Sequence, residues 1–219
     1  MKNTYRGVVF DLDGTLIDSL EEIATATNHT LEGSGLPPHP RDAYKYFAGH
    51  GARVLMERAA PKEVVSDPEQ FEPLLERFLA YYHQLTGTIA RPYDGIPEML
   101  TALTNRGLKL FVLTNKPHES AGECVTELMP DWTFTQILGA RDNVPKKPDP
   151  TGAIELLDTT GIKGEEMLYL GDTAVDMKTA SGAGMVPVGV LWGFREREEL
   201  EQSGARHLIA HPLELLDLL

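Results

Sequence analysis

Near its N-terminus the chain reads Val8-Val9-Phe10-Asp11-Leu12-Asp13-Gly14-Thr15. Residues 8–10 are β-branched or aromatic and stop at a turn signal, which predicts a short buried strand. Asp11 and Asp13 are two positions apart, so both carboxylates would lie together at the carboxyl end of this strand, where open α/β sheets bind ligands. Gly14 allows a sharp turn after them. Because adjacent carboxylates repel each other, the pair requires a metal ion, a shared proton or basic neighbours; an ordinary acidic strand end is the alternative.

Composition limits the protein to a few classes. The 219 residues are 42% hydrophobic and 24% charged, enough for one large domain or one domain with a smaller satellite. Twenty basic and 33 acidic side chains give a net charge of −13, which disfavours nucleic acid and anionic membranes as partners but allows a small anionic substrate. The single cysteine, Cys124, excludes an intramolecular disulfide, and no apolar run has the length of a signal peptide or a membrane span. We expect a cytoplasmic protein, and the sequence predicts no oligomeric state.

The segment from Ser19 to Arg91 carries helical periodicity and no convincing strand. Apolar residues share one helical face over positions 20–31, and a longer amphipathic pattern covers positions 71–82. A shorter helix is predicted over positions 54–59. We interpret this segment as a compact helical unit.

From Pro92 onward, predicted helices and strands alternate. We expect strands over residues 108–113, 136–138, 167–170, 186–191 and 207–209, and helices over residues 97–105, 117–128, 149–158 and 174–183 before a closing helix. This alternation predicts right-handed crossovers and a Rossmann-like α/β fold, a parallel sheet with helices on both faces. The strand at residues 8–10 has no other partner and must join this sheet. The core domain would therefore comprise residues 1–17 and 91–219, with the helical domain, residues 18–90, inserted after the first strand.

Polar residues follow the strand predicted at residues 108–113. Thr114 and Asn115 offer a hydroxyl and an amide that can hydrogen-bond an anion, together with backbone N–H groups of the next helix; a simple helix cap explains them equally well. Lys147 precedes Pro148, which favours an extended backbone at the lysine. Its ammonium could then lie between a carboxylate and a phosphate, whereas a solvated surface lysine is the alternative.

A second acidic strand end lies at Gly171-Asp172. Asp176 follows one helical turn later, on the same side as Asp172. Carboxylates clustered at parallel strand ends suit Mg²⁺, a hard cation that takes a few carboxylates and keeps water and substrate oxygens; an N-cap at Asp172 is compatible with that role. Acids, an anion-binding hydroxyl and a lysine at successive strand ends together predict a site for phosphoryl transfer.

These motifs resemble the four motifs of haloacid dehalogenase-like phosphatases. The matching residues are Asp11 to Leu16, Thr114-Asn115, Lys147-Pro148, and Gly171-Asp172 with Asp176. The resemblance covers nearly the whole chain, and the helical insertion looks like the mobile cap of that family. Residues 140–148 and 49–55 are most similar to the phosphoglycolate phosphatase branch. The implied activity is Mg²⁺-dependent hydrolysis of a small phosphorylated metabolite, with phosphoglycolate the first candidate.

The resemblance implies a role for each acidic residue. Asp11 would be the nucleophile that attacks phosphorus and becomes an aspartyl-phosphate. Asp13 would protonate the leaving alkoxide and then deprotonate the water that hydrolyses the intermediate. Mg²⁺ would be held by Asp11, by the backbone carbonyl of Asp13 and by Asp172, with Asp176 in outer support.

The remaining motif residues would compensate negative charge. Thr114 and Asn115 would bind the oxygens of the transferring phosphoryl group, and Lys147 would offset the charges of Asp11 and the phosphate. Such compensation is a physical requirement, since an anionic nucleophile cannot otherwise approach an anionic ester.

The cap would supply substrate contacts when it closes over the site and excludes water. Gly49, His50, Gly51 and Arg53 are the candidates for contacting the end of the substrate that carries no phosphate. Arg53 suits a carboxylate. The glycines could equally form a plain turn, and His50 could be a surface residue.

Several other functions use related residues. A dehalogenase is disfavoured because it needs neither the acid at position 13 nor Mg²⁺, and a phosphonate hydrolase needs a cap lysine that Lys45 and Lys62 do not suggest. A sugar-phosphate mutase stays open, as do a phosphosugar, a nucleotide and pyrophosphate as substrates. A phospho-acceptor signalling domain is the non-enzymatic alternative, and the inserted cap argues against it.

Overall fold

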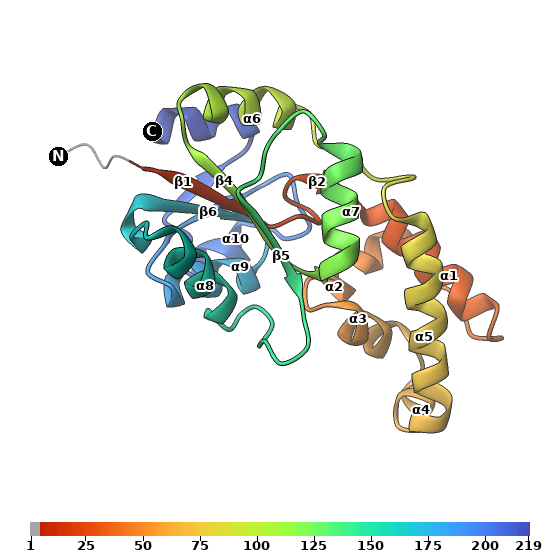
Figure 1. The fold of residues 1–219 in the computed structure, drawn as a ribbon. Helices are drawn as coiled ribbons and strands as arrows, with labels where there is room; N and C mark the ends of the chain where they lie inside the picture. Colours follow the sequence, from red (N-terminus) through yellow and green to blue (C-terminus); the bar gives the residue numbers. More distant parts are fainter. Residues whose placement is uncertain (1–4) are drawn as a thin grey trace.

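The protein, seen in a computed structural model that describes residues 5–219, is built on a parallel sheet (Figure 1). The six strands lie in the order β5-β4-β1-β6-β7-β8, and every neighbouring pair is parallel. The strands are β1 (Gly7–Phe10), β4 (Lys109–Pro117), β5 (Gln136–Ala140), β6 (Met167–Gly171), β7 (Val186–Val190) and β8 (His207–Ile209). The predicted α/β fold with a Rossmann-like sheet is confirmed.

Helices cover both faces of this sheet. One face packs against α6 (Ile96–Asn105), α7 (His118–Leu128) and the 3₁₀ helix η3 (Pro212–Leu218). The other packs against α8 (Thr151–Thr160), α9 (Ala174–Gly182) and α10 (Arg197–Gln202), and the short η2 (Gly164–Glu166) precedes β6. Side chains alternate along β1, so the strand contributes to the hydrophobic core on both faces of the sheet. Val8 and Phe10 lie in the buried cluster on one face, and Val9 lies in the cluster on the other. Such a strand, buried on both sides, is typical of parallel sheets.

The register of the sheet brings the predicted site residues to one edge. Phe10 at the end of β1 pairs with Val112 of β4 and with Leu170 of β6. The residues that follow these three positions along the chain therefore emerge side by side at the carboxyl ends of the strands.

A block of helices fills residues 19–90, all of which the structure describes, and no strand lies among them. It contains α1 (Leu20–Glu32), η1 (Arg41–Ala43), α2 (Tyr44–Phe47), α3 (Ala52–Ala59), α4 (Lys62–Val65) and α5 (Pro68–Leu85). The chain enters it through β2 (Ile17–Asp18) and leaves it through β3 (Arg91–Pro92), and these two short strands pair antiparallel. The ribbon formed by β2 and β3 lies at the predicted boundaries between the two domains, after residue 17 and after residue 90. The division into two domains itself stays a prediction.

The helical block has a hydrophobic core of its own. Helices α1 and α5 pack against each other and bury Leu31, Phe71 and Phe78 among other residues. Phe194, which lies between β7 and α10, also belongs to this cluster, so a loop of the sheet unit is embedded in the helical block. Figure 1 shows the block beside the carboxyl ends of the strands.

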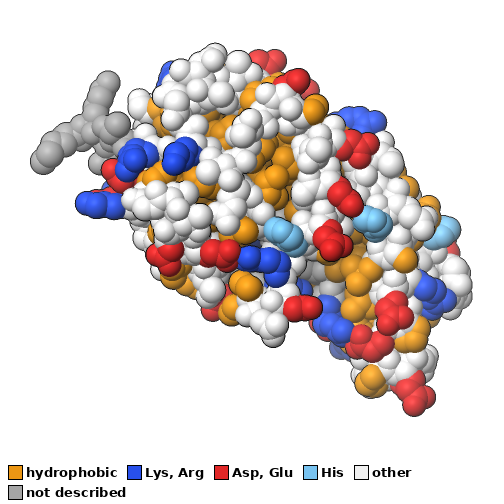
Figure 2. All heavy atoms as spheres, in the orientation of Figure 1, with side chains coloured by type: hydrophobic (Ala, Val, Ile, Leu, Met, Phe, Trp, Pro, Cys, Tyr) orange, Lys and Arg blue, Asp and Glu red, His pale blue; other side chains and the backbone are white. Residues whose placement is uncertain are grey.

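Two elements near the C-terminus differ from the prediction. Helix α10 is not anticipated by the sequence pattern, and the closing segment is a 3₁₀ helix in which the Glu214 N–H bonds to the His211 carbonyl. Over residues 5–219, no helix combines the length and the apolar character needed to span a membrane. On the face drawn in Figure 2, acidic and basic side chains are interspersed.

Candidate active site

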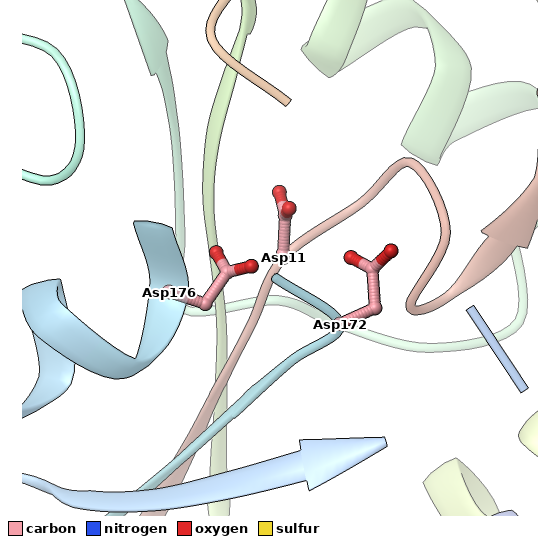
Figure 3. Close-up of side chains that lie close together, drawn as sticks. All are labelled: Asp11, Asp172 and Asp176. Atoms are coloured by element: carbon pink, nitrogen blue, oxygen red, sulfur yellow. The ribbon is translucent and has the colours of Figure 1, made fainter. Parts of the chain in front are cut away.

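Three buried carboxylates meet at the edge where the strands end (Figure 3). Asp11 follows β1, Asp172 follows β6, and Asp176 lies in the first turn of α9. One oxygen from each of the three lies within 4.8 Å of the others. Asp176 is held in place because its Oδ2 accepts hydrogen bonds from the backbone N–H and the hydroxyl of Thr173, at 3.1 and 2.7 Å.

Lys147 neutralises part of this cluster. It comes from the loop between β5 and α8, and only 2% of its side chain is exposed. Its Nζ lies 2.9 Å from Asp11 Oδ1 and 2.7 Å from Asp176 Oδ1. The ammonium therefore bridges two of the three acids, and Asp172 is left without a cationic partner at contact distance among the described residues.

Burial, with the negative charge that remains, raises the pKa of two of the three acids. Burial, together with repulsion from Asp176, raises the pKa of Asp11 to about 7, although Lys147 opposes the shift. Burial and the charges of Asp176 and Asp11 raise the pKa of Asp172 well above its ordinary value. Each shift records the free-energy cost of holding these carboxylates ionised with too little positive charge nearby. A divalent cation would remove that cost, and clustered carboxylate oxygens are ligands that such cations prefer.

The backbone around Asp172 fixes its orientation. Its Oδ2 accepts a hydrogen bond from the Phe194 N–H at 2.8 Å, and its Oδ1 accepts one from the Thr15 hydroxyl at 3.3 Å. Gly14 has a φ of +83°, and a Cβ at this position would lie 2.4 Å from Asp172 Oδ2. Glycine is therefore required there both by backbone conformation and by space.

Thr114 and Asn115 lie at the same edge, at the end of the apolar part of β4. Thr114 lines a cavity beside Asp11, and its contact with an anion stays a prediction. Asn115 also lines it, but its side chain is already used: it donates to the carbonyls of Gly49 and Lys147, both at 3.0 Å, and accepts from the Lys147 N–H at 3.0 Å. The side-chain amide of Asn115 thus holds Lys147 and the helical block in place, and the contact of Asn115 with a phosphoryl oxygen stays a prediction.

The cavity lies between the sheet edge and the helical block. The acids Asp11 and Asp13 line it on the sheet side, while Gly49 and Gly51 line it on the helical side. Arg53 does not line it, because its guanidinium forms a bidentate pair with Glu72 at 2.9 and 2.7 Å on the exposed surface of the block. His50 does not line it either; its Nδ1 is buried without a partner among the described residues, and burial together with Arg58 and Arg195 lowers its pKa.

Lys116 and Tyr82 also line the cavity, and neither is among the site residues predicted from the sequence. Lys116 directly follows Thr114-Asn115, and its Nζ contacts Asp13 Oδ1 at 3.4 Å and the Tyr82 hydroxyl. A lysine within a stretch expected to be buried is the signal that could have revealed it, because lysine is almost never fully buried without a partner.

Comparison with known proteins places this arrangement in context. The sequence profile of the haloacid dehalogenase-like hydrolases matches residues 8–190. An N-acetylmuramic acid 6-phosphate phosphatase of Pseudomonas aeruginosa is 32% identical over 98% of this chain and 94% of its own length. A phosphoglycolate phosphatase of Mesorhizobium japonicum is 33% identical over 97% of this chain and 95% of its own length.

A solved structure has the same fold throughout. The crystal structure of a predicted phosphoglycolate phosphatase from Haemophilus somnus superposes with a TM-score of 0.91 at 29% identity, and it covers 98% of both chains. The similarity therefore extends over the helical block as well as the sheet.

Proposed function

This chain belongs to the haloacid dehalogenase-like hydrolase family, and we propose on that basis that it is an Mg²⁺-dependent phosphatase that acts through an aspartyl-phosphate on small phosphorylated metabolites, phosphoglycolate first among them. The observation that carries the proposal is the buried group of Asp11, Asp172 and Asp176, with Lys147 beside it, at the edge of the sheet. Its relatives named as phosphatases are about a third identical over nearly the whole chain, which supports the enzyme class.

In this mechanism a carboxylate oxygen of Asp11 attacks phosphorus, and the bond from phosphorus to the ester oxygen breaks. Lys147 and the Thr114 hydroxyl stabilise charge on the phosphoryl oxygens during this transfer. Mg²⁺ bound by Asp11, Asp172 and the backbone carbonyl of Asp13, with Asp176 in support, would supply the positive charge that Lys147 alone does not.

Asp13 handles protons in both halves of the reaction. Its carboxyl group lines the cavity next to Asp11 and has a side chain that is 19% exposed, within reach of a substrate. It donates a proton to the departing alkoxide, and it later accepts one from the water that attacks the aspartyl-phosphate. The free phosphate then leaves, and the Asp11 carboxylate is restored.

We expect added MgCl₂ to raise the melting temperature much more at pH 8 than at pH 5. Without metal, burial raises the pKa of Asp11 from its ordinary 3.8 to about 7, so the folded state keeps a proton that the unfolded chain loses. The free energy of unfolding therefore falls as the pH rises from about 4 to about 7. A bound cation replaces that proton and restores about 2.7 kcal/mol at a hundredfold excess over Kd.

Differential scanning fluorimetry checks this expectation, since each kcal/mol moves the melting temperature by roughly 2–4 °C in a chain of this size. The Asp172→Asn variant is the control, and in it the rise in melting temperature caused by Mg²⁺ should be smaller than in the wild type. An equal shift at both pH values in the wild type would contradict metal binding at these carboxylates.

The substrate is tested by steady-state release of phosphate from a panel of monophosphates. We expect kcat/KM to be highest for 2-phosphoglycolate, followed by N-acetylmuramic acid 6-phosphate, a sugar phosphate, a nucleoside monophosphate and pyrophosphate. Chelation of the metal should stop turnover, and added Mg²⁺ should restore it. The order of the first two compounds decides between the two named relatives.

The same assay separates the alternative functions. A sugar-phosphate mutase would isomerise its substrate without releasing stoichiometric phosphate. A phospho-acceptor signalling domain would show no multiple turnover of p-nitrophenyl phosphate. For the compartment we propose the cytoplasm, which the buried free thiol of Cys124 supports.

A further inference from the structure

Lys116 is a buried cation beside the group that transfers protons. It lies in β4, and 1% of its side chain is exposed. Its Nζ lies 3.4 Å from Asp13 Oδ1, and it also donates to the hydroxyl of Tyr82, which α5 of the helical block contributes. The same Nζ is 4.3 Å from the centre of the Tyr82 ring. One lysine of the sheet unit thus touches both a catalytic acid and the opposite wall of the cavity.

The walls of this cavity contain little positive charge. On the helical side they are largely apolar and include Ile23, Leu55 and Phe78. On the sheet side they include two acids, Asp11 and Asp13. Within residues 5–219, Lys116 is the one lysine or arginine among the lining residues. Lys147 lies behind this wall, paired with Asp11, and Lys146 lies beside Gly51. Lys116 is therefore the cation that the cavity wall itself presents to an anionic group on the leaving side of a substrate.

Burying an ammonium is costly, so this one must be compensated in the folded state. The Asp13 carboxylate, 3.4 Å from Nζ, and the Tyr82 hydroxyl supply this compensation. The side chain is thus cationic. An ammonium has three N–H donors, and the contacts recorded among the described residues, to Asp13 and Tyr82, use two of them.

We propose that Lys116, oriented by Tyr82, binds a carboxylate on the leaving group and selects phosphate esters of α-hydroxy acids. This inference rests on the proposed function, since Asp13 marks the position of the ester oxygen only if it protonates that oxygen. In an ester of an α-hydroxy acid, one carbon atom separates the ester oxygen from the carboxylate. A cation in contact with Asp13 is therefore at the right distance to bind that carboxylate. It is too close to the reaction centre to bind a carboxylate farther along a longer substrate.

This assignment differs from the prediction made from the sequence, in which Arg53 binds the carboxylate. Arg53 was the candidate for a carboxylate because guanidinium groups bind carboxylates in a bidentate manner. Its bidentate partner in the structure is Glu72, and the pair lies on the exposed surface of the helical block.

The test compares two esters in the Lys116→Met variant. The esters are 2-phosphoglycolate and 2-hydroxyethyl phosphate, which differ by a carboxylate in place of a hydroxymethyl group. The measured quantity is the ratio of their kcat/KM values. We expect that ratio to exceed one in the wild type and to fall by about 10- to 100-fold in the variant, the range for a lost charge-assisted hydrogen bond. Lys109→Met, an exposed lysine at the opposite end of β4, is the matched control and should keep the wild-type ratio.

A purely positioning role for Lys116 gives a different result. If the lysine only holds Asp13 in place, both esters lose activity in parallel, the ratio stays constant and the proposal is overturned. A ratio that changes in Arg53→Met and not in Lys116→Met overturns it as well.

A second variant covers the case in which Lys116→Met does not fold, as judged by circular dichroism. Tyr82→Phe leaves the lysine in place and removes its hydroxyl partner, and we expect the ratio to fall several-fold; an unchanged ratio overturns the proposal. A wild type that hydrolyses both esters equally well also overturns it and leaves the phosphatase assignment intact. A wild type that hydrolyses neither ester overturns the proposal, and one that also releases no phosphate from any other compound of the panel refutes the proposed function itself.

Discussion

Replacing Asp11 by Asn is expected to abolish turnover, with kcat lower by roughly 10⁴-fold or more, as for the loss of a covalent nucleophile. The amide has almost the same shape as the carboxylate but cannot form an acyl phosphate. Folding should survive, because Lys147 keeps its 2.7 Å contact with Asp176. At pH 8 without metal the melting temperature should equal or exceed that of the wild type, since the burial and repulsion that raise the pKa of Asp11 to about 7 no longer act on a charge.

Phosphate release and fluorimetry measure both quantities in the same preparation. Asp131→Asn, the same chemical change at an exposed carboxylate, serves as the control and should behave like the wild type. Substantial phosphatase activity in Asp11→Asn would remove Asp11 from the nucleophilic role, whatever its effect on stability.

For Asp13→Asn we expect a loss that depends on the leaving group. With an alkyl phosphate, kcat should fall by about 10²–10⁴-fold, because the departing alkoxide needs a proton. With p-nitrophenyl phosphate the first step should fall much less, since the phenolate leaves without one. Hydrolysis of the aspartyl-phosphate still needs a base, so the phosphorylated enzyme should accumulate.

Rapid quenching followed by mass spectrometry detects that accumulation on the peptide that contains Asp11. Asp131→Asn again provides the control. Unchanged steady-state rates with both esters would show that Asp13 transfers no proton in the rate-determining steps.

The sheet and its acidic edge were predictable because their signals are local. Each of β1 and β6 is an apolar run that ends at an aspartate, and parallel pairing forces such ends together. The fold prediction and the gathering of Asp11, Asp172 and Asp176 depend on that single geometric rule. Because Phe10 pairs with Leu170, the residues that follow the two strands, Asp11 and Gly171-Asp172, come out side by side.

Features that depend on packing between distant segments were not predictable. The sequence marks Lys116 only as a lysine next to a stretch expected to be buried, and its contacts with Tyr82 and Asp13 depend on how distant segments pack. The sequence predicts that Arg53 contacts a carboxylate of the substrate, and it does not show that the guanidinium pairs with Glu72 on another helix. Periodicity reveals that a helix is amphipathic, and it does not reveal which partner each polar side chain meets.

The pairing of Ile17–Asp18 with Arg91–Pro92 has an evolutionary consequence. Because the two ends of the insertion lie next to each other, a replacement of any length could be spliced in at this point without displacing a strand. If the helical block contacts the substrate as we propose, variation in that block changes which metabolites are accepted, while Asp11, Asp172 and Asp176 stay together at the edge of the sheet. Only pairs of residues in contact across the boundary between the sheet and the helical block, such as Lys116 and Tyr82, would have to coevolve.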